Sequence, residues 1–173
     1  LDKFRLDNKV ALVTGAAAGL GAAIAVALAE AGADVVAHGN SRAPDATCEL
    51  INRAGRHSLA VRGDLTDKTT PPQLIAQTLD EFERLDILIN NAGTIRRAPA
   101  VDYTEEDWAT VIEVNLSSVF RLSQLAGRHM IGRTDRGGKI VNIASLLSFQ
   151  GGLTVPAYAA AKGGVAQLTK ALA

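Results

Sequence analysis

The amino-acid sequence predicts an α/β protein built on a doubly wound parallel sheet with helices on both faces. Two observations support this prediction. Five short β-type runs alternate with helix-type runs between residues 10 and 143. The β-type runs are mostly apolar rather than alternating with polar residues, as is typical of strands covered on both faces. Right-handed crossovers between such strands favour a doubly wound sheet.

The expected strands are short runs dominated by Val, Ile, Leu and Ala. They are predicted at residues 10–13, 34–38, 58–62, 87–90 and 139–143. Helices are predicted between them, at residues 19–31, 44–53, 71–82 and 104–129. Gly32 and Gly55 follow the first two helices, as glycines often do at helix ends. Pro71 and Pro72 open the third helix in its tolerated first turn, and Thr104 precedes three acids as an N-cap does.

Composition sets the broad class of the protein. The 173 residues are 47% hydrophobic and carry 18 basic and 18 acidic side chains. They fit one globular domain over residues 1–173, large enough to bury a core. The zero net charge argues against a basic nucleic-acid binder. The longest apolar stretch, residues 20–29, is too short for a membrane span and no leader peptide opens the chain, so we expect a cytoplasmic protein without a membrane partner.

No metal site or disulfide is expected. Cys48 is the only cysteine, so it has no partner for an intramolecular disulfide. His38, His57 and His129 are scattered and lack the spacing of zinc ligands. We therefore predict structural or solvated roles for the three histidines.

A glycine-rich turn follows the first predicted strand. It reads Thr14-Gly15-Ala16-Ala17-Ala18-Gly19-Leu20-Gly21 and leads into a helix. Glycines let the backbone approach a pyrophosphate, and the helix N-terminus directs free N–H groups at it. The spacing is Gly-x-x-x-Gly-x-Gly, which differs from the dinucleotide fingerprint Gly-x-Gly-x-x-Gly. A phosphate cradle is the functional interpretation, and a glycine-rich turn without a ligand is the alternative.

Tyr158 and Lys162 are four residues apart, so on a helix they project from one face. A phenol titrates near ~10 in water and needs a nearby cation to work as an acid or base at neutral pH. Lys162 is placed to be that cation, and Ser145 to hold a carbonyl or hydroxyl oxygen beside the phenol. The trio suits proton transfer to an oxygen whose carbon exchanges a hydride. Taken alone, the Tyr/Lys pair also fits an ordinary solvated helix.

Six motifs follow one another in the order and at the separations of a known family. They are Thr14-Gly-x-x-x-Gly-x-Gly21, Asp64-Leu65, Asn90-Asn91-Ala92-Gly93, Asn115, Ser145 and Tyr158-x-x-x-Lys162. With them, nearly the whole chain resembles the short-chain dehydrogenase/reductases, which implies a Rossmann fold and an NAD(P)-dependent oxidoreductase. Segments 90–97 and 145–152 resemble the sugar-acid branch, the 2-deoxy-D-gluconate 3-dehydrogenases or 2-keto-3-deoxy-gluconate 5-dehydrogenases.

The resemblance implies four catalytic residues. Tyr158 would be the general acid/base, and Lys162 would stabilise its ionised form and bind the nicotinamide ribose. Ser145 would orient the substrate oxygen. Asn115 would hold a water that links Lys162 to solvent, and a local helix hydrogen bond is its alternative role.

The resemblance also implies a cofactor site at the carboxyl ends of the strands. The glycines of the turn would line the pyrophosphate, Asp64 would accept from the adenine amino group beside Leu65, and Asn91 to Gly93 would approach the adenosine ribose. The complete predicted set is Thr14, Gly15, Gly19, Leu20, Gly21, Asp64, Leu65, Asn91, Ala92, Gly93, Tyr158 and Lys162.

The choice between NAD and NADP follows neither simple family pattern. NAD enzymes usually carry an acid where this chain has Gly39, and NADP enzymes tend to carry a basic residue where it has Ala18 or Asn40. Arg42 is close enough in sequence to reach a 2′-phosphate, or it is a solvated loop charge. The resemblance to the sugar-acid branch favours NAD, with NADP as the alternative.

Arg96 and Arg97 suggest how a substrate is bound. Two arginines directly after the fourth strand would neutralise a sugar-acid carboxylate at the mouth of the cleft. Neighbouring side chains diverge, so one or both are alternatively solvated. Gln150 is a candidate for a sugar hydroxyl, or else an exposed loop amide.

The predicted function is therefore hydride transfer between NAD(P) and a sugar acid such as 2-deoxy-D-gluconate. The alternatives are a 3-oxoacyl carrier-protein reductase, which has the same catalytic motifs, and a non-catalytic nucleotide-binding regulator. We expect a homo-oligomer, either a dimer or a tetramer. Family members continue for several tens of residues beyond the point where this sequence stops, so the C-terminal part of the fold is expected to be missing.

Overall fold

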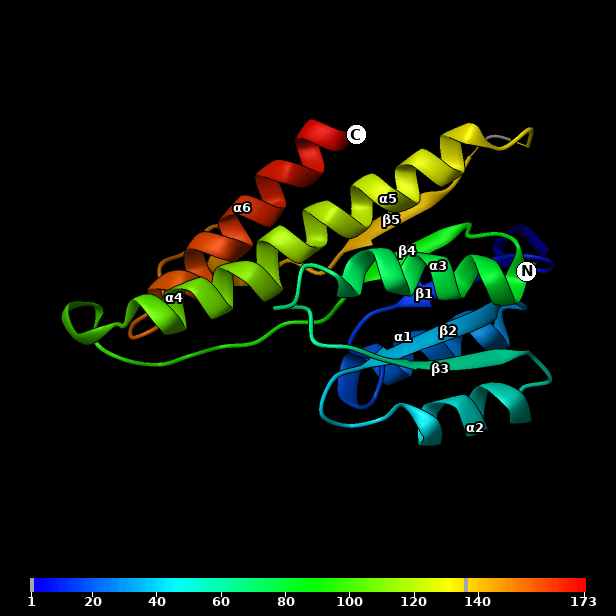
Figure 1. Ribbon diagram of the computed structural model, residues 1–173, viewed down its shortest axis with the longest axis horizontal. Helices are drawn as coiled ribbons and strands as arrows, with labels where there is room; N and C mark the ends of the chain where they lie inside the picture. Colours follow the sequence, from blue (N-terminus) through cyan, green and yellow to red (C-terminus); the bar gives the residue numbers. More distant parts are fainter. Residues whose placement is uncertain (1, 136) are drawn as a thin grey trace.

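The computed structural model describes residues 2–135 and 137–173, which form a five-stranded parallel sheet between helices (Figure 1). The strand order is β3-β2-β1-β4-β5. The strands are β1 (Val10–Val13), β2 (Asp34–Gly39), β3 (Ser58–Arg62), β4 (Ile87–Asn90) and β5 (Lys139–Asn142). The predicted α/β, doubly wound fold is confirmed, and each predicted strand is present within one residue of its expected bounds.

Helices pack on both faces because neighbouring residues of a strand point to opposite sides. Ala11 and Val13 of β1 lie in one apolar cluster with residues of α1 (Gly19–Glu30) and α2 (Asp45–Arg53). Leu12, between them, lies in a second cluster with residues of α3 (Thr70–Phe82) and α5 (Ser118–Gly132). All three β1 side chains are fully buried, which explains why this strand shows no polar alternation.

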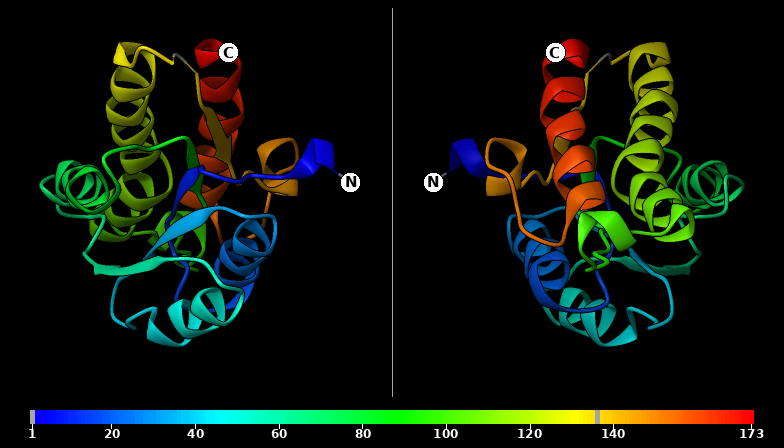
Figure 2. Two further views of the ribbon diagram at one scale, coloured as in Figure 1. Left: turned by 90° about the vertical axis from the view of Figure 1, so that its right-hand side faces the viewer. Right: turned by 90° about the vertical axis from the view of Figure 1, so that its left-hand side faces the viewer.

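The sheet order places β1 where the winding reverses. From β1 the chain extends to β2 and β3 on one side, and to β4 and β5 on the other. Accordingly, β3 and α2 lie at one end of the molecule, and β5, α5 and α6 (Pro156–Leu172) at the other (Figure 2). In open α/β sheets, ligands bind outside the carboxyl ends of the strands at this reversal point. The glycine turn after β1 and the Asn-Asn-Ala-Gly segment after β4 meet there.

The long helix predicted at 104–129 is interrupted. It consists of α4 (Glu105–Ile112), a π-helical turn (Glu113–Ser117) and α5, which continues to Gly132. The Thr104 hydroxyl caps α4 by accepting from Asp107 N, as its sequence pattern predicts. The π turn contains Asn115, whose side chain is fully buried. Single π turns inside α-helices occur often at functional sites.

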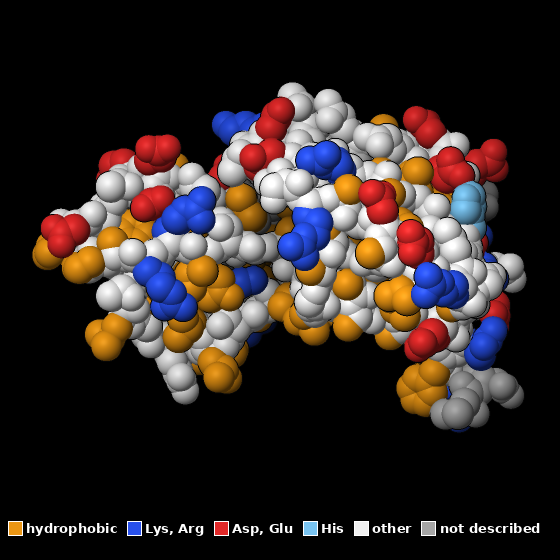
Figure 3. Space-filling model, turned by 90° about the horizontal axis from the view of Figure 1, so that it is seen from below, with side chains coloured by type: hydrophobic (Ala, Val, Ile, Leu, Met, Phe, Trp, Pro, Cys, Tyr) orange, Lys and Arg blue, Asp and Glu red, His pale blue; other side chains and the backbone are white. Residues whose placement is uncertain are grey.

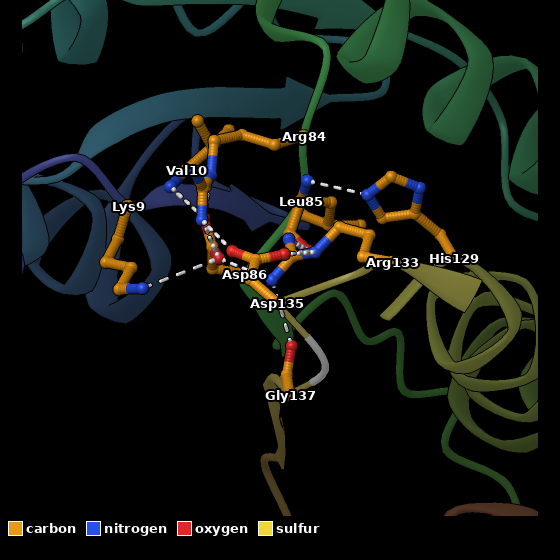
Figure 4. Close-up of polar contacts among 9 residues, drawn as sticks. All are labelled: Lys9, Val10, Arg84, Leu85, Asp86, His129, Arg133, Asp135 and Gly137. Atoms are coloured by element: carbon orange, nitrogen blue, oxygen red, sulfur yellow. Dashed lines mark hydrogen bonds and ion pairs between the residues drawn. The ribbon is translucent and has the colours of Figure 1, made fainter. Parts of the chain in front are cut away.

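A buried ion cluster centres on Asp86, just before β4, at the amino end of the sheet (Figure 4). The Asp86 carboxylate accepts from Val10 N at 2.9 Å, from Arg84 at 2.7 and 2.8 Å, and from Arg133 at 2.9 Å. Burial alone would raise the pKa of Asp86, but these donors and charges lower it to about 2. The cluster ties β1, β4 and the segment after α5 together at the edge away from the predicted site.

None of the described helices combines the length and apolarity that a membrane span requires.

Candidate functional site

The glycine turn has a backbone that only glycine fits. Gly15 has φ +67°, and a Cβ there would lie 2.9 Å from the Cα of Ala92. A Cβ on Gly21 would lie 2.2 Å from the carbonyl oxygen of Gly15. The turn is therefore closed on itself and pressed against the segment after β4.

Thr14 and Asn91 hold these two segments together. The Thr14 hydroxyl donates to Ile89 O and accepts from the backbone N–H groups of Asn91 and Ala92, both at 3.0 Å. In return, the Asn91 side chain donates to Thr14 O at 2.9 Å and to Gly15 O at 3.2 Å. The Asn91 amide is therefore occupied in shaping the turn.

Helix α1 begins within this turn, at Gly19. No side chain caps the helix, and its first turn carries no acidic residue. Its N–H groups and positive dipole end therefore face no competing carboxylate of their own helix, which suits an incoming pyrophosphate. Leu20 in this first turn is 59% exposed.

A cavity of about 290 Å³ opens between the ends of β1, β2, β3 and β4. Predicted cofactor residues line it from three loops: Gly15, Asp64, Leu65, Ala92 and Gly93. The structure thus brings these residues together. Asn40, which was considered for the choice between NAD and NADP, also lines it. Other residues in its wall were not anticipated from the sequence: His38, Thr66, Thr94, Thr110 and Val114.

His38 is the clearest of these omissions. The sequence offered only a lone histidine at the end of an apolar strand, which is ordinarily structural. In the structure its side chain is 1% exposed. Nδ1 lies 3.4 Å from Gly15 N and Nε2 lies 2.9 Å from Gly63 O, so the ring bridges the glycine turn and the end of β3. The feature of the sequence that could have identified His38 is its position at the carboxyl end of a strand inside the predicted sheet.

Gly39 lacks the acid of many NAD enzymes for a steric reason. A Cβ at position 39 would lie 2.1 Å from the carbonyl oxygen of Arg42. The backbone of the following loop therefore fills the place of a side chain. Arg62 of β3 holds this loop by donating to Asn40 O at 3.1 Å and to Ser41 O at 3.2 Å.

Lys162 lies on α6, one turn after Tyr158, and is 4% exposed. Its Nζ is 5.7 Å from the centroid of the Tyr158 ring and donates to Ile143 O at 2.5 Å. Burial lowers the pKa of Lys162. The ammonium is thus fixed beside the phenol by the carboxyl end of β5.

Ser145 begins a short 3₁₀ helix, Leu146–Ser148, after β5. Its hydroxyl accepts from Leu147 N at 3.1 Å and, as a hydroxyl, can still donate one hydrogen bond. Ser145 N donates to the Ser148 hydroxyl, which in turn donates to Lys162 O at 2.7 Å. Ser148 was not anticipated from the sequence, yet it couples the serine loop to the helix of Tyr158 and Lys162.

Asn115 uses its buried amide to bind the backbone. Nδ2 donates to Thr94 O and to Val111 O, both at 2.8 Å, and Oδ1 accepts from Thr94 N at 3.2 Å. The bond to Val111 O is the local helix bond considered as the alternative role. The pair of bonds to Thr94 fastens the loop after β4 to the π turn. The role in holding a water stays a prediction.

Arg96 and Arg97 diverge. Arg96 lines the nucleotide-side cavity, pairs with Asp107 at 3.3 Å and donates to the Thr94 hydroxyl at 3.2 Å. Arg97 is exposed, and within the described residues it makes no hydrogen bond or ion pair. Of these two arginines, only Arg97 has a guanidinium without an intramolecular partner in the part of the chain that the structure describes.

Gln150 is exposed, as the alternative reading expected. It lies in the segment between β5 and α6, which also exposes Leu146, Phe149 and Leu153. Figure 3 shows hydrophobic side chains on the surface at the end of the molecule that carries α4.

No group of side chains among residues 2–135 and 137–173 has the composition to hold a metal ion.

Comparison with known proteins connects this geometry to a family. The family model described as short chain dehydrogenase matches residues 9–173. The chain belongs to this family. Short chain dehydrogenases of this kind are NAD(P)-dependent oxidoreductases that act on CH–OH groups, so the predicted enzyme class is confirmed.

The chain is similar to 2-dehydro-3-deoxy-D-gluconate 5-dehydrogenases of two bacteria. It is 46% identical over 173 residues to that of Escherichia coli, which covers 100% of this chain and 68% of the relative. It is 48% identical over 172 residues to that of Bacillus subtilis, which covers 99% of this chain and 66% of the relative. The chain therefore spans about two thirds of the length of these short chain dehydrogenases.

Two solved structures share the fold. A short-chain alcohol dehydrogenase from Sinorhizobium meliloti aligns with a TM-score of 0.93 and 39% identity, covering 98% of this chain and 67% of that one. A structure from Agrobacterium tumefaciens, described as a 2-deoxy-D-gluconate 3-dehydrogenase with bound NADP, aligns with a TM-score of 0.87 and 48% identity, covering 98% of this chain and 66% of that one. The expectation of a nicotinamide dinucleotide cofactor is thereby confirmed at the level of NAD(P).

Proposed function

We propose that the intact protein transfers a hydride between NAD(P) and a hydroxyl or ketone carbon of a sugar acid related to 2-dehydro-3-deoxy-D-gluconate. The observation that carries the chemistry is the placement of the Lys162 ammonium 5.7 Å from the Tyr158 ring, on the same helix face. The names and identity of the relatives, 45–48% in four bacteria, carry the choice of substrate.

In this proposal the side chains of the protein transfer the proton and orient the substrate oxygen. NAD(P), when bound, supplies or accepts the hydride. Tyr158 gives a proton to, or takes it from, the substrate oxygen, and Lys162 stabilises the ionised phenol. Ser145 donates its remaining hydrogen bond to the same oxygen. The glycine turn and the free N–H groups of α1 hold the pyrophosphate, and Asp64, Leu65 and Gly93 form the adenosine side of the cavity.

Arg97 is the residue that we propose for the substrate carboxylate. Its guanidinium is exposed and follows the loop that Asn115 fastens beside the cavity. Arg96 is held by Asp107 and Thr94, so we assign it to positioning of this loop rather than to the substrate. Gln150 remains a candidate for a sugar hydroxyl.

Three further properties belong to this proposal. Residues 1–173 act as one nucleotide-binding domain, since the described strands form a single sheet between two apolar clusters. The intact enzyme is a homo-oligomer, a dimer or a tetramer, and it works in the cytoplasm.

The test uses the full-length enzyme with NAD or NADP against four substrates. These are 2-dehydro-3-deoxy-D-gluconate, 2-deoxy-D-gluconate, a neutral polyol and a 3-oxoacyl thioester. We expect the highest kcat/KM for one of the sugar acids. A higher value for the thioester would instead support a carrier-protein reductase, the name of relatives at 38–39% identity. Cofactor binding without turnover of any substrate would support a nucleotide-binding regulator.

A further inference from the structure

His38 lies where three strand ends meet, and its ring contacts two of them. The residue belongs to β2, next to its last residue. Its Nδ1 lies 3.4 Å from Gly15 N, in the turn after β1, and its Nε2 lies 2.9 Å from Gly63 O, just after β3. Its own backbone carbonyl accepts from Ala16 N at 2.7 Å. One residue therefore holds two consecutive N–H groups of the glycine turn.

The partners determine the protonation state of the ring. Gly63 O can only accept, so Nε2 must carry a hydrogen. The N–H of Gly15 can only donate, so Nδ1 must present its lone pair. Both contacts are satisfied together only by the neutral imidazole with its hydrogen on Nε2.

Side chains hold both backbone groups of Gly15, so the two peptide units on either side of this residue are both fixed. His38 accepts from its N–H, while the Asn91 side chain donates to its carbonyl at 3.2 Å. The carbonyl also lies against Gly21, where no side chain fits. The orientations of these two peptide units therefore decide how the turn meets the N-terminus of α1.

We propose that His38 is a positioning residue for the cofactor site. Its neutral ring holds the peptide unit between Thr14 and Gly15 in the orientation that receives the dinucleotide pyrophosphate, and protonation of the ring releases that peptide unit. This proposal deepens the proposed function, since it concerns the same cofactor site. A proton on Nδ1 would face the Gly15 N–H, and two donors cannot bond to each other. The turn would then lose its hydrogen bond to the His38 ring, while its bonds to the His38 carbonyl and to the Asn91 side chain would remain.

The burial of His38 and the charged groups around it decide the pH at which its ring is protonated. Burial lowers the pKa of His38, so the ring is neutral at physiological pH. Asp64, after β3, acts in the opposite direction, and its own pKa is held below the usual range by the N–H and hydroxyl of Thr66. Arg96 lines the same cavity from the loop after β4. The turn at residues 14–21 carries no titratable side chain. From α2, the neutral hydroxyl of Thr47 donates to Ala16 O in this turn.

The test measures binding of ADP-ribose to the full-length enzyme by calorimetry between pH 5.0 and 7.5. This probe has the pyrophosphate and needs no substrate turnover, so a wrong choice of sugar acid leaves the result intact. In the wild type we expect the Kd to rise about fivefold to tenfold as the pH falls through the lowered pKa of His38, the loss expected for about one hydrogen bond.

Two variants of His38 test its two ring contacts one at a time. His38→Asn places an amide oxygen near the position of Nδ1 and does not titrate, so we expect binding close to wild type at pH 7.5 and no acid dependence. His38→Gln retains a donor toward Gly63 but not the acceptor for Gly15, so we expect about fivefold to tenfold weaker binding at every pH. An Asn variant with the wild-type acid dependence, or a Gln variant with wild-type affinity at pH 7.5, would overturn the proposal.

A measurement on the wild type keeps the proposal testable if either variant fails to fold. Selective ¹⁵N labelling of histidine reports which ring nitrogen of His38 carries the proton. We expect hydrogen on Nε2 alone at pH 7.5 and on both nitrogens where ADP-ribose binding weakens. Hydrogen on Nδ1 at pH 7.5 would contradict the proposed grip on Gly15.

Discussion

The Nζ of Lys162 is shared between the carbonyl oxygen of Ile143 and the face of the Tyr158 ring, 5.7 Å from its centroid. The carbonyl belongs to the segment just after β5, and the ring to the first turns of α6. One ammonium therefore fixes the position of the phenol relative to the carboxyl edge of the sheet. The hydroxyl of Tyr158 is the group that we propose for proton transfer.

Tyr158→Phe in the full-length enzyme removes only that hydroxyl. We expect kcat to fall by about 10²–10⁴-fold, the usual contribution of general acid/base catalysis, with the Kd of the cofactor nearly unchanged. Steady-state kinetics and cofactor titration measure the two effects. Tyr103→Phe is the matched control, since its hydroxyl only donates to Arg96 O. Retention of more than about a tenth of wild-type kcat in Tyr158→Phe would remove this residue from the role of proton donor.

Arg97→Ala is expected to weaken an acidic substrate selectively. Loss of a charge-assisted hydrogen bond costs about 1.5–3 kcal/mol, seen as a lower kcat/KM for the sugar acid and little change for a neutral alcohol analogue. Arg96→Ala breaks the contacts with Asp107 and Thr94, so it should affect charged and neutral substrates equally. If both variants lose activity equally on both substrates, the arginines only support the loop. If neither single variant nor the double variant loses activity, the carboxylate proposal fails.

Cofactor preference is expected to favour NAD. No basic side chain stands at Ala18 or Asn40, and the guanidinium of Arg62 is already bound to the carbonyls of Asn40 and Ser41. The measurement is kcat/KM for NAD and NADP with the full-length enzyme. A preference for NADP that disappears in Arg42→Ala would reverse the expectation and make Arg42 the reader of the 2′-phosphate. Arg53→Ala, on exposed α2 surface beside Glu49, is the control.

Asp86→Asn is expected to destabilise the fold at neutral pH and to flatten its acid dependence. The folded pKa of Asp86 is about 2, against about 3.9 in an unfolded chain. Because the folded pKa is the lower one, the carboxylate stabilises the protein above about pH 4, and this contribution of about 2.5 kcal/mol is lost as the pH falls toward 2.

Urea unfolding of wild type and variant between pH 2 and 7 measures this contribution. The two free energies of unfolding should differ by about 2–4 kcal/mol at pH 7 and converge at low pH. Asp135→Asn is the control, since its side chain in the same cluster is 57% exposed and should cost no more than about 1 kcal/mol. An equal loss at pH 2 and pH 7 would show that the effect is steric rather than ionic.

The sequence predicted the strands well because β1 and its neighbours are short, apolar and separated by glycines and caps. It also predicted which loops meet, because the carboxyl ends of parallel strands lie at one edge. The π turn could not be predicted from local spacing, and the amide of its Asn115 bonds to Thr94, 21 residues away in the chain. Periodicity reports only neighbours along a helix.

In the candidate site, too, features set by local spacing could be predicted and features set by contacts between distant segments could not. Gly15 and Asp64, which line one cavity, and Tyr158 and Lys162, which lie side by side, could be predicted as site residues because their motifs have fixed local spacing. His38 and Ser148 were missed because their partners, Gly63 O and Lys162 O, are backbone atoms of distant segments. Arg96 and Arg97 look alike in sequence, and only the position of Asp107 in the fold separates them.

The crowding at Gly39 bears on how this protein could sharpen its discrimination between NAD and NADP over evolution. In a protein with open space there, one substitution introduces an acid that selects NAD. Here that route requires the carbonyl of Arg42 to move first, and Arg62 holds the two preceding carbonyls. A sharper selection of NAD would therefore arise by changing the length or course of residues 40–42. Cofactor engineering in this scaffold should start from loop libraries rather than from point substitutions at position 39.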